Sequence, residues 1–113
     1  MTITVSMLAG YGEGPLFFDM DDTMRCNHTV AEAASYLGLS KATATDLEDW
    51  DQEYQRTLDH TYPPDSRFPS PEAKRAWIER GKELAARIKQ DSSIVASVDY
   101  QANGCYENGT CVF

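Results

Sequence analysis

Residues 29–58 read TVAEAASYLGLSKATATDLEDWDQEYQRTL and contain the signals of two consecutive helices. Thr29 and Glu32 form a capping box, which predicts a short helix that ends at Gly38. Ser40 is a favourable N-cap residue for a second helix. The apolar residues of this second helix recur at three- and four-residue steps, which predicts one buried face: Ala44, Leu47, Trp50, Tyr54 and Leu58.

The chain after this stretch contains a break and then a third helix. The prolines within residues 62–69 end helical structure, because each lacks an N–H and biases the preceding residue to extended geometry. Ser70 is the expected cap of the third helix, with Pro71 at its first position. Its buried face has the same helical spacing: Ala73, Trp77, Gly81, Leu84 and Ile88.

Three segments outside the helices have strand patterns. Residues 2–8 and 94–101 alternate apolar with polar or small residues, and Leu16–Phe18 follow a glycine-rich connection that suits a hairpin. Residues 19–28 are interpreted as an acidic loop. The sequence therefore predicts an α+β fold in a single domain, residues 1–113. An N-terminal hairpin and a C-terminal strand form a small antiparallel or mixed sheet, packed against about three helices.

Charge and composition exclude several functions. The 113 residues leave room for one domain, and a chain that is 42% hydrophobic can fold around a core. Residues 1–66 have a net charge of −9 and residues 67–90 one of +4, within a total of −8. Such a chain repels phosphate backbones and anionic membranes, so we expect neither partner. The first residues lack the features of a signal peptide, and we expect a cytoplasmic protein.

The second predicted helix carries the candidate partner-binding residues. Asp46, Asp49 and Glu53 fall at i, i+3 and i+7, on the side opposite its apolar face. A row of carboxylates presents charge to a basic protein much as a phosphate backbone does. Two flanking acids and one aromatic anchor complete the predicted site: Asp22, Glu48 and Tyr54. A face that is acidic only to be solvated is the open alternative.

Residues 17–23 read FFDMDDT, an apolar segment followed by Asp-x-Asp-x-Thr. The stretch resembles the first motif of the haloacid-dehalogenase-type phosphatases. The resemblance implies Asp19 as nucleophile, Asp21 as general acid and Mg²⁺ to screen the carboxylates. The later acidic pair and lysine of that family have no counterpart after Thr23. A magnesium-dependent phosphatase is therefore an alternative function.

Nine residues between 29 and 47 share another known spacing: Thr29, Glu32, Ala33, Ala34, Leu37, Gly38, Ser40, Thr43 and Leu47. They resemble the helix-turn-helix of excisionase-like regulators. The resemblance implies a second helix in the DNA major groove. This helix instead carries five carboxylates between Asp46 and Glu53, which a phosphate backbone would repel. A regulator derived from a helix-turn-helix is a second alternative.

The chain has three cysteines: Cys26, Cys105 and Cys111. An odd number fits a reducing compartment better than a disulfide framework. A hairpin turn at Asn108-Gly109 would place Cys105 opposite Val112, whereas a turn at Asn103-Gly104 would place it elsewhere, so a bridge to Cys111 stays open. The two histidines lack zinc-site spacing to any cysteine. We predict no metal and no cofactor.

Several short stretches lie between residues 11 and 88: Tyr11-Gly12-x-Gly14-Pro15-Leu16, Leu37-x-Leu39-Ser40, Leu47-x-x-Trp50, Thr57-Leu58, Phe68-Pro69-Ser70-Pro71-Glu72-Ala73, Gly81 and Leu84-Ala85. Together they resemble small acidic proteins of high-GC bacteria. The short length, the acidity and the lack of a catalytic pattern are similar to immunity proteins of bacterial toxin systems. We therefore expect an immunity-type inhibitor that is not an enzyme and binds a basic toxin or another cationic protein. Its oligomeric state does not follow from the sequence.

Overall fold

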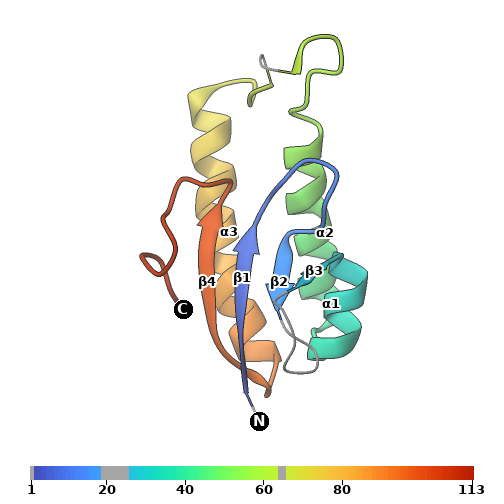
Figure 1. Cartoon of the computed structure of the whole chain (residues 1–113), viewed down its shortest axis with the longest axis vertical. Helices are drawn as coiled ribbons and strands as arrows, with labels where there is room; N and C mark the ends of the chain where they lie inside the picture. The colour runs from blue at the N-terminus through green and yellow to red at the C-terminus, as the bar shows by residue number, and fades with distance from the viewer. Residues whose placement is uncertain (1, 19–25, 64–65) are drawn as a thin grey trace.

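The computed structural model describes residues 2–18, 26–63 and 66–113 (Figure 1). Its elements in chain order are β1 (Ile3–Leu8), β2 (Leu16–Phe18), β3 (Cys26–His28), α1 (Val30–Leu37), α2 (Lys41–Gln55), α3 (Pro71–Asp91) and β4 (Val95–Ala102). The strands form one sheet in the order β3-β2-β1-β4. Helices α2 and α3 lie across one face of this sheet, and α1 packs against α2 (Figure 1). The predicted α+β fold is confirmed.

β1 lies between two partners of opposite direction. It pairs antiparallel with β2, where Met7 is opposite Leu16. It pairs parallel with β4, where Met7 is opposite Tyr100 and Val5 is opposite Val98. Parallel strands need a long crossover, and the three helices provide it by carrying the chain across one face before β4 begins. The sheet is therefore mixed, one of the two forms that the sequence allows.

Residues 26–28 correct one sequence prediction. Instead of ending an acidic loop, they form β3, antiparallel to β2, with Phe18 opposite Cys26. The sequence did not predict this strand, because three residues are too few to show an alternation of apolar and polar residues. The Asn27 amide ties this strand to the β1–β2 connection, because Oδ1 accepts from the Gly14 N–H at 3.1 Å and Nδ2 donates to the Gly14 carbonyl. The rest of the predicted loop, residues 19–25, lies outside the described residues.

The helices begin at the predicted caps. The Glu32 N–H donates to the Thr29 hydroxyl at 3.2 Å and the Thr29 N–H donates to the Glu32 carboxylate at 3.0 Å, which completes the capping box of α1. Gly38 ends α1 at a φ of 75°, a conformation that glycine adopts without strain. Ser40 and Ser70 cap α2 and α3.

Helix α2 is shorter than predicted. It ends at Gln55, so Leu58 is not part of its apolar face. Thr57 explains the ending, because its N–H and its hydroxyl both donate to the Tyr54 carbonyl, at 3.0 and 2.6 Å. This tight turn replaces the next helical hydrogen bonds.

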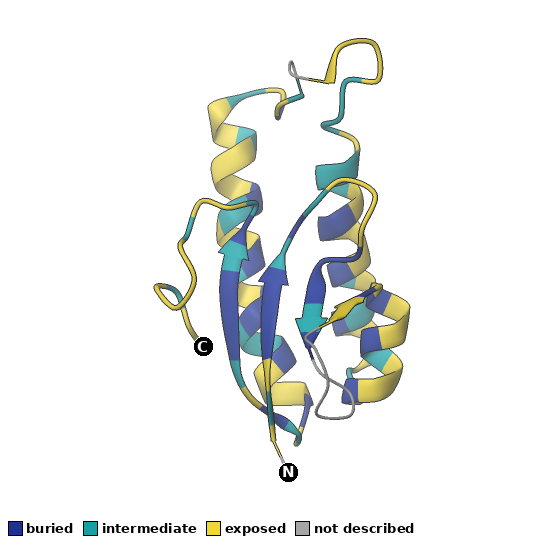
Figure 2. Ribbon diagram, in the orientation of Figure 1, coloured by how far each residue is buried: buried dark blue, intermediate teal, exposed yellow. Residues whose placement is uncertain are grey.

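The core lies between the sheet and the inner faces of α2 and α3 (Figure 2). Trp50 and Trp77 are fully buried at the contact between the two helices, with ring centroids 4.4 Å apart and planes 5° from parallel. Each indole N–H donates to the backbone carbonyl of the other tryptophan, at 3.0 Å from Trp50 and 2.8 Å from Trp77. The stack and the reciprocal bonds fix the two helices relative to each other.

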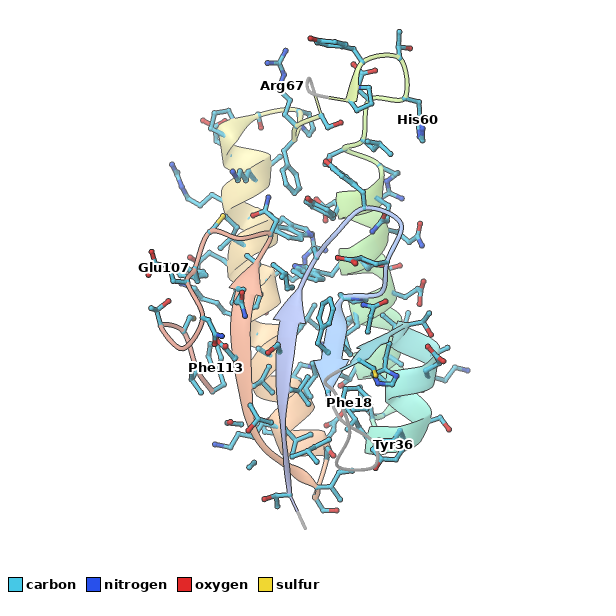
Figure 3. All side chains as sticks on the ribbon, in the orientation of Figure 1. Phe18, Tyr36, His60, Arg67, Glu107 and Phe113 are labelled. Carbon is cyan, nitrogen blue, oxygen red and sulfur yellow. The ribbon has the colours of Figure 1, made fainter. Side chains whose placement is uncertain are left out.

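The C-terminal tail, residues 103–113, runs along the outer edge of β4 (Figure 3). The Val98 and Phe113 backbones exchange two hydrogen bonds of 2.9 Å, and Val112 lies opposite Asp99. A hairpin with Cys105 opposite Val112 is therefore wrong, because the tail pairs with β4 rather than with itself. The tail covers the edge of the sheet that β4 would otherwise expose.

Candidate functional site

Helix α2 carries five acidic side chains between Asp46 and Glu53. Leu47 and Trp50 face the core and thereby fix the rotation of the helix. The acids then divide between the two sides of the helix. Asp46, Asp49 and Glu53 border α3, whereas Glu48 and Asp51 border the β1–β2 connection.

Two of the predicted partner-binding carboxylates have cationic partners on α3. Arg87 Nη1 lies 2.6 Å from Asp46 Oδ2, and Arg80 Nη2 lies 2.5 Å from Glu53 Oε2. These side chains are 30–49% exposed, so each pair contributes at most about 1 kcal/mol to stability. Asp49 is exposed and makes no ion pair within the described residues. The predicted row thus combines paired and unpaired charge.

The other acidic side of α2 faces a hollow of about 580 Å³ beneath the β1–β2 connection. Glu48 is exposed there, whereas Asp51 is only 8% exposed. Burial, and then the neighbouring Glu48 carboxylate, raise the pKa of Asp51. Glu13 from the β1–β2 connection is a third carboxylate at this hollow.

The predicted aromatic anchor is only half-buried at the surface. Tyr54 stacks between Tyr11, at 4.6 Å, and Trp77, at 5.4 Å between ring centroids. Burial raises the pKa of the Tyr54 phenol to about 12. Tyr11 covers it with a ring that is 37% exposed, and its hydroxyl is hydrogen bonded to Thr57 at 2.5 Å. Tyr11 is therefore the more exposed aromatic of this surface.

Other candidate residues are outside the described residues or far apart. Asp22 and the Asp19–Thr23 motif are not among the residues that the structure describes. The two histidines are far apart. His60 lies on the α2–α3 connection at one end of the molecule (Figure 3). His28 stacks on Phe18, with ring centroids 4.0 Å apart, and Phe18 is distant from that end. Over residues 2–18, 26–63 and 66–113 no three His, Cys, Asp or Glu side chains are grouped to hold a metal.

Cys105 and Cys111 are free thiols, and Cys26 and Cys105 are exposed. Cys26 is on β3 and the other two are on the C-terminal tail. In the described part of the chain, no helix has the length and apolar character of a membrane span.

The sequence model of the Serratia CdiI immunity protein-like family matches residues 3–103. The chain belongs to this family. The match begins at the first residue of β1 and ends just after β4, so it includes every helix and strand described above. No curated protein matches the chain.

Membership in the CdiI immunity protein-like family implies a protein partner, a toxin, and the role of a non-enzymatic inhibitor. The predicted resemblance to immunity proteins is thereby confirmed. Most of the C-terminal tail lies beyond the matched residues, whereas α2 and the β1–β2 connection lie within them.

Sequence reasoning missed the basic side of this surface. Arg80 and Arg87 are seven residues apart, as are Asp46 and Glu53, so both pairs recur after two helical turns. Opposite charges with equal spacing on two consecutive helices are a signal for this pairing. Tyr11 carried no comparable signal, because an aromatic residue in a glycine-rich connection has no periodicity.

Proposed function

We propose that this protein neutralises a toxin by binding a basic toxin surface with the acidic face of α2. The family supplies the class of partner, and the exposed carboxylate of Asp49 between two ion pairs is the observation that carries the proposed surface. The net charge of −8 would attract a basic protein from a distance. Asp46, Asp49 and Glu53 would make the charged contacts, with Glu48 on the same helix as a further one. Asp22, also predicted to take part, lies outside the described residues.

Tyr54 would contribute to this surface by packing beneath Tyr11. Its ring stacks on Tyr11, which presents a partly exposed aromatic ring on the β1–β2 connection. Aromatic residues in such positions often provide much of the binding energy of an interface. The proposed complex therefore combines charge at Asp49 with aromatic contact at Tyr11.

Neutralising the three predicted contacts together should slow association with the toxin. The variant combines Asp46→Asn, Asp49→Asn and Glu53→Gln, and it leaves the two arginines of α3 unpaired. We expect the association rate at low salt to fall at least about tenfold. The three carboxylates no longer attract the basic toxin, and the two unpaired arginines repel it at this face. The measurement is surface plasmon resonance at several salt concentrations, with the toxin captured from the source organism and purified.

The control removes the same number of negative charges elsewhere. Glu72→Gln, Glu79→Gln and Glu107→Gln are exposed positions on α3 and on the C-terminal tail. We expect a much smaller change, from net charge alone. If the two triple variants associate at the same rate, the acidic face of α2 is not the docking surface.

Removing the basic partners should have the opposite effect. With Arg80→Gln and Arg87→Gln, both carboxylates of the ion pairs become available, and we expect association to become several-fold faster. Stability should change by less than about 1 kcal/mol for each pair. The control, Lys74→Gln with Arg75→Gln, changes the net charge equally at exposed positions nearer the start of α3. Slower association of the Arg80/Arg87 variant alone would show that the arginines themselves contact the toxin.

A further inference from the structure

The C-terminal tail, residues 103–113, contains two Asn-Gly pairs, Asn103-Gly104 and Asn108-Gly109. An asparagine before glycine is prone to deamidation, because glycine has no Cβ to keep its backbone nitrogen away from the preceding side-chain carbonyl. Both glycines have a positive φ, 99° for Gly104 and 82° for Gly109. The same spontaneous reaction is therefore open to two positions, and their surroundings decide which of them reacts faster.

The Asn103 position is held at both reacting groups. The Gly104 N–H donates to the Gln101 carbonyl at 2.9 Å. The Asn103 Oδ1 accepts from the Cys105 thiol, with 2.9 Å between oxygen and sulfur. Asn103 is also half-buried, so both groups must leave local hydrogen bonds before they can react.

The Asn108 position differs in its side chain. Asn108 is exposed, and its side-chain amide makes no hydrogen bond within the described residues. It follows Glu107, which lies on the outer side of the tail (Figure 3). The side-chain carbonyl carbon of Asn108 is thus accessible to a nucleophile, and the state of the Gly109 nitrogen controls the reaction.

The Gly109 nitrogen is held by a buried carboxylate. It lies 3.1 Å from Asp99 Oδ1 and 3.2 Å from Asp99 Oδ2, and its N–H donates to both. Asp99 is 5% exposed on β4, and Gln101 Nε2 lies 3.4 Å from the same Oδ2. A hydrogen bond to a carboxylate is stronger than one between neutral groups, so this contact fastens the middle of the tail to the sheet. We call the contact between Asp99 and Gly109 the latch.

We infer that Asn108 is a site of spontaneous deamidation, and that the reaction is blocked while the latch is closed. The negative charge of Asp99 opposes removal of the proton from the nitrogen that is bonded to it. Local opening of the tail exposes this nitrogen to water. The tail is a segment where such opening is expected, because residues 104, 105 and 107–110 are exposed.

The chemistry then needs only water and hydroxide. Hydroxide removes the Gly109 amide proton, and the nitrogen forms a bond to Cγ of Asn108. The Cγ–Nδ2 bond breaks, and Nδ2 takes a proton from water and leaves as ammonia, which regenerates hydroxide. Water then opens the succinimide ring at either carbonyl and yields aspartate or isoaspartate at position 108. No oxidant or reductant takes part.

Each product prevents the latch from closing again. The nitrogen of the succinimide carries no hydrogen and cannot donate to Asp99. Ring opening restores the N–H but leaves a new carboxylate beside Gly109, where it repels the carboxylate of Asp99. The tail is then held by its remaining bonds to β4, such as those between Phe113 and Val98. Deamidation therefore loosens the segment that covers the edge of β4.

The first test compares the two asparagines in the same molecules. The full chain is incubated at neutral pH for several weeks and then cleaved with chymotrypsin, which cuts after Tyr106 and separates Asn103 from Asn108. Mass spectrometry of the two peptides measures the conversion of amide to acid. We expect deamidation at Asn108 to be several-fold faster than at Asn103. Equal rates, or a faster reaction at Asn103, would overturn the inference.

Asp99→Ala removes the latch. We expect deamidation at Asn108 to become at least about tenfold faster, because a hydrogen bond to a charged group shifts the opening equilibrium by at least that factor. Glu107→Gln is the matched control, since it removes an exposed carboxylate one residue from Asn108 and leaves the latch intact. An unchanged rate in Asp99→Ala would contradict the blocking role of the latch. A slower rate would do the same and make Asp99 the base that removes the proton.

The rate at Asn103 shows whether Asp99→Ala keeps its fold. If both asparagines react faster in this variant, Asp99→Asn replaces it, because asparagine keeps an acceptor oxygen and loses only the charge. We expect Asp99→Asn to accelerate the reaction at Asn108 less than Asp99→Ala does and to leave Asn103 unchanged. Acceleration of both asparagines in Asp99→Asn as well would mean that the latch does not act on Asn108 specifically.

Hydrogen exchange tests whether the reaction loosens the tail. Asn108→Asp imitates one product, and Asn108→Gln is the uncharged control that keeps an amide. The Tyr100 N–H donates to the Cys111 carbonyl and the Phe113 N–H to the Val98 carbonyl, so both report on the pairing of the tail with β4. We expect both to exchange several-fold faster in Asn108→Asp, and in the incubated protein, than in Asn108→Gln. Equal exchange in the two variants would show that deamidation leaves the tail in place and would overturn this part of the inference.

Discussion

Trp77→Ala is expected to lower the free energy of unfolding by about 3–5 kcal/mol, the largest single loss that we predict for this chain. The substitution leaves a cavity beneath α2, removes the ring stacked on Trp50 and deletes the N–H that donates to the Trp50 carbonyl. Small domains have a total stability of about 5–15 kcal/mol, so this variant would be close to unfolded. Urea unfolding followed by far-ultraviolet circular dichroism measures the effect without relying on tryptophan emission.

Two further variants keep this prediction testable. Trp77→Phe retains an aromatic ring and loses only the hydrogen bond and part of the volume, so we expect a loss of about 2 kcal/mol that remains measurable. Tyr62→Ala removes another large aromatic side chain, but Tyr62 is 58% exposed and its loss should change stability by less than about 0.5 kcal/mol. A Trp77→Ala variant as stable as Tyr62→Ala would contradict the central role of the tryptophan pair.

The spacing of apolar residues predicted the helical part of the core correctly. Leu47, Trp50, Trp77 and Leu84 are all fully or almost fully buried, as their three- and four-residue steps require. The same spacing does not indicate that two indoles exchange hydrogen bonds across α2 and α3. That contact depends on how two helices cross, which periodicity within one helix does not determine.

The features of the sheet that the sequence did not predict were hidden for a different reason. Strand β3 and the tail pairing of residues 111–113 are too short for alternation to be visible, and each is held by partners remote in sequence. The parallel direction of β4 is equally invisible, because a strand that is buried on one face alternates in the same way in either direction. Local sequence therefore indicated which segments extend but not how they pair.

The acidic surface could be predicted only in part for the same reason. Helical spacing correctly indicated that Asp46, Asp49 and Glu53 lie outside the buried face of Leu47 and Trp50. It gave no sign that Asp51 is buried. It could not indicate that Arg80 and Arg87 would reach two of them, since this depends on α3 lying antiparallel beside α2. The hollow at Asp51 was equally hidden, because its other walls come from segments up to 43 residues away, as in the bond from the Gly12 N–H to Gln55.

Gly81→Ala is expected to lower the free energy of unfolding by about 2 kcal/mol, although alanine is the better helix former by about 1 kcal/mol. Gly81 is buried in the middle of α3, against strand β4. A Cβ at this position would overlap the phenolic oxygen and the ring of Tyr100. Tyr100 has little freedom to withdraw, because it is fully buried and its hydroxyl donates to the Ile78 carbonyl at 2.8 Å.

Ala76→Gly provides the converse exchange on the same helix. Ala76 is exposed, so glycine there should cost only the difference in helix propensity, about 1 kcal/mol. Combining Gly81→Ala with Tyr100→Phe removes the phenolic oxygen from the overlap, and the two changes should therefore destabilise less together than the sum of their separate effects. The ring carbon Cζ would still lie 2.5 Å from the new Cβ, so the relief is partial. If Gly81→Ala stabilises the protein as it would on an exposed helix, α3 and β4 do not approach as closely as the contact between Gly81 and Tyr100 requires.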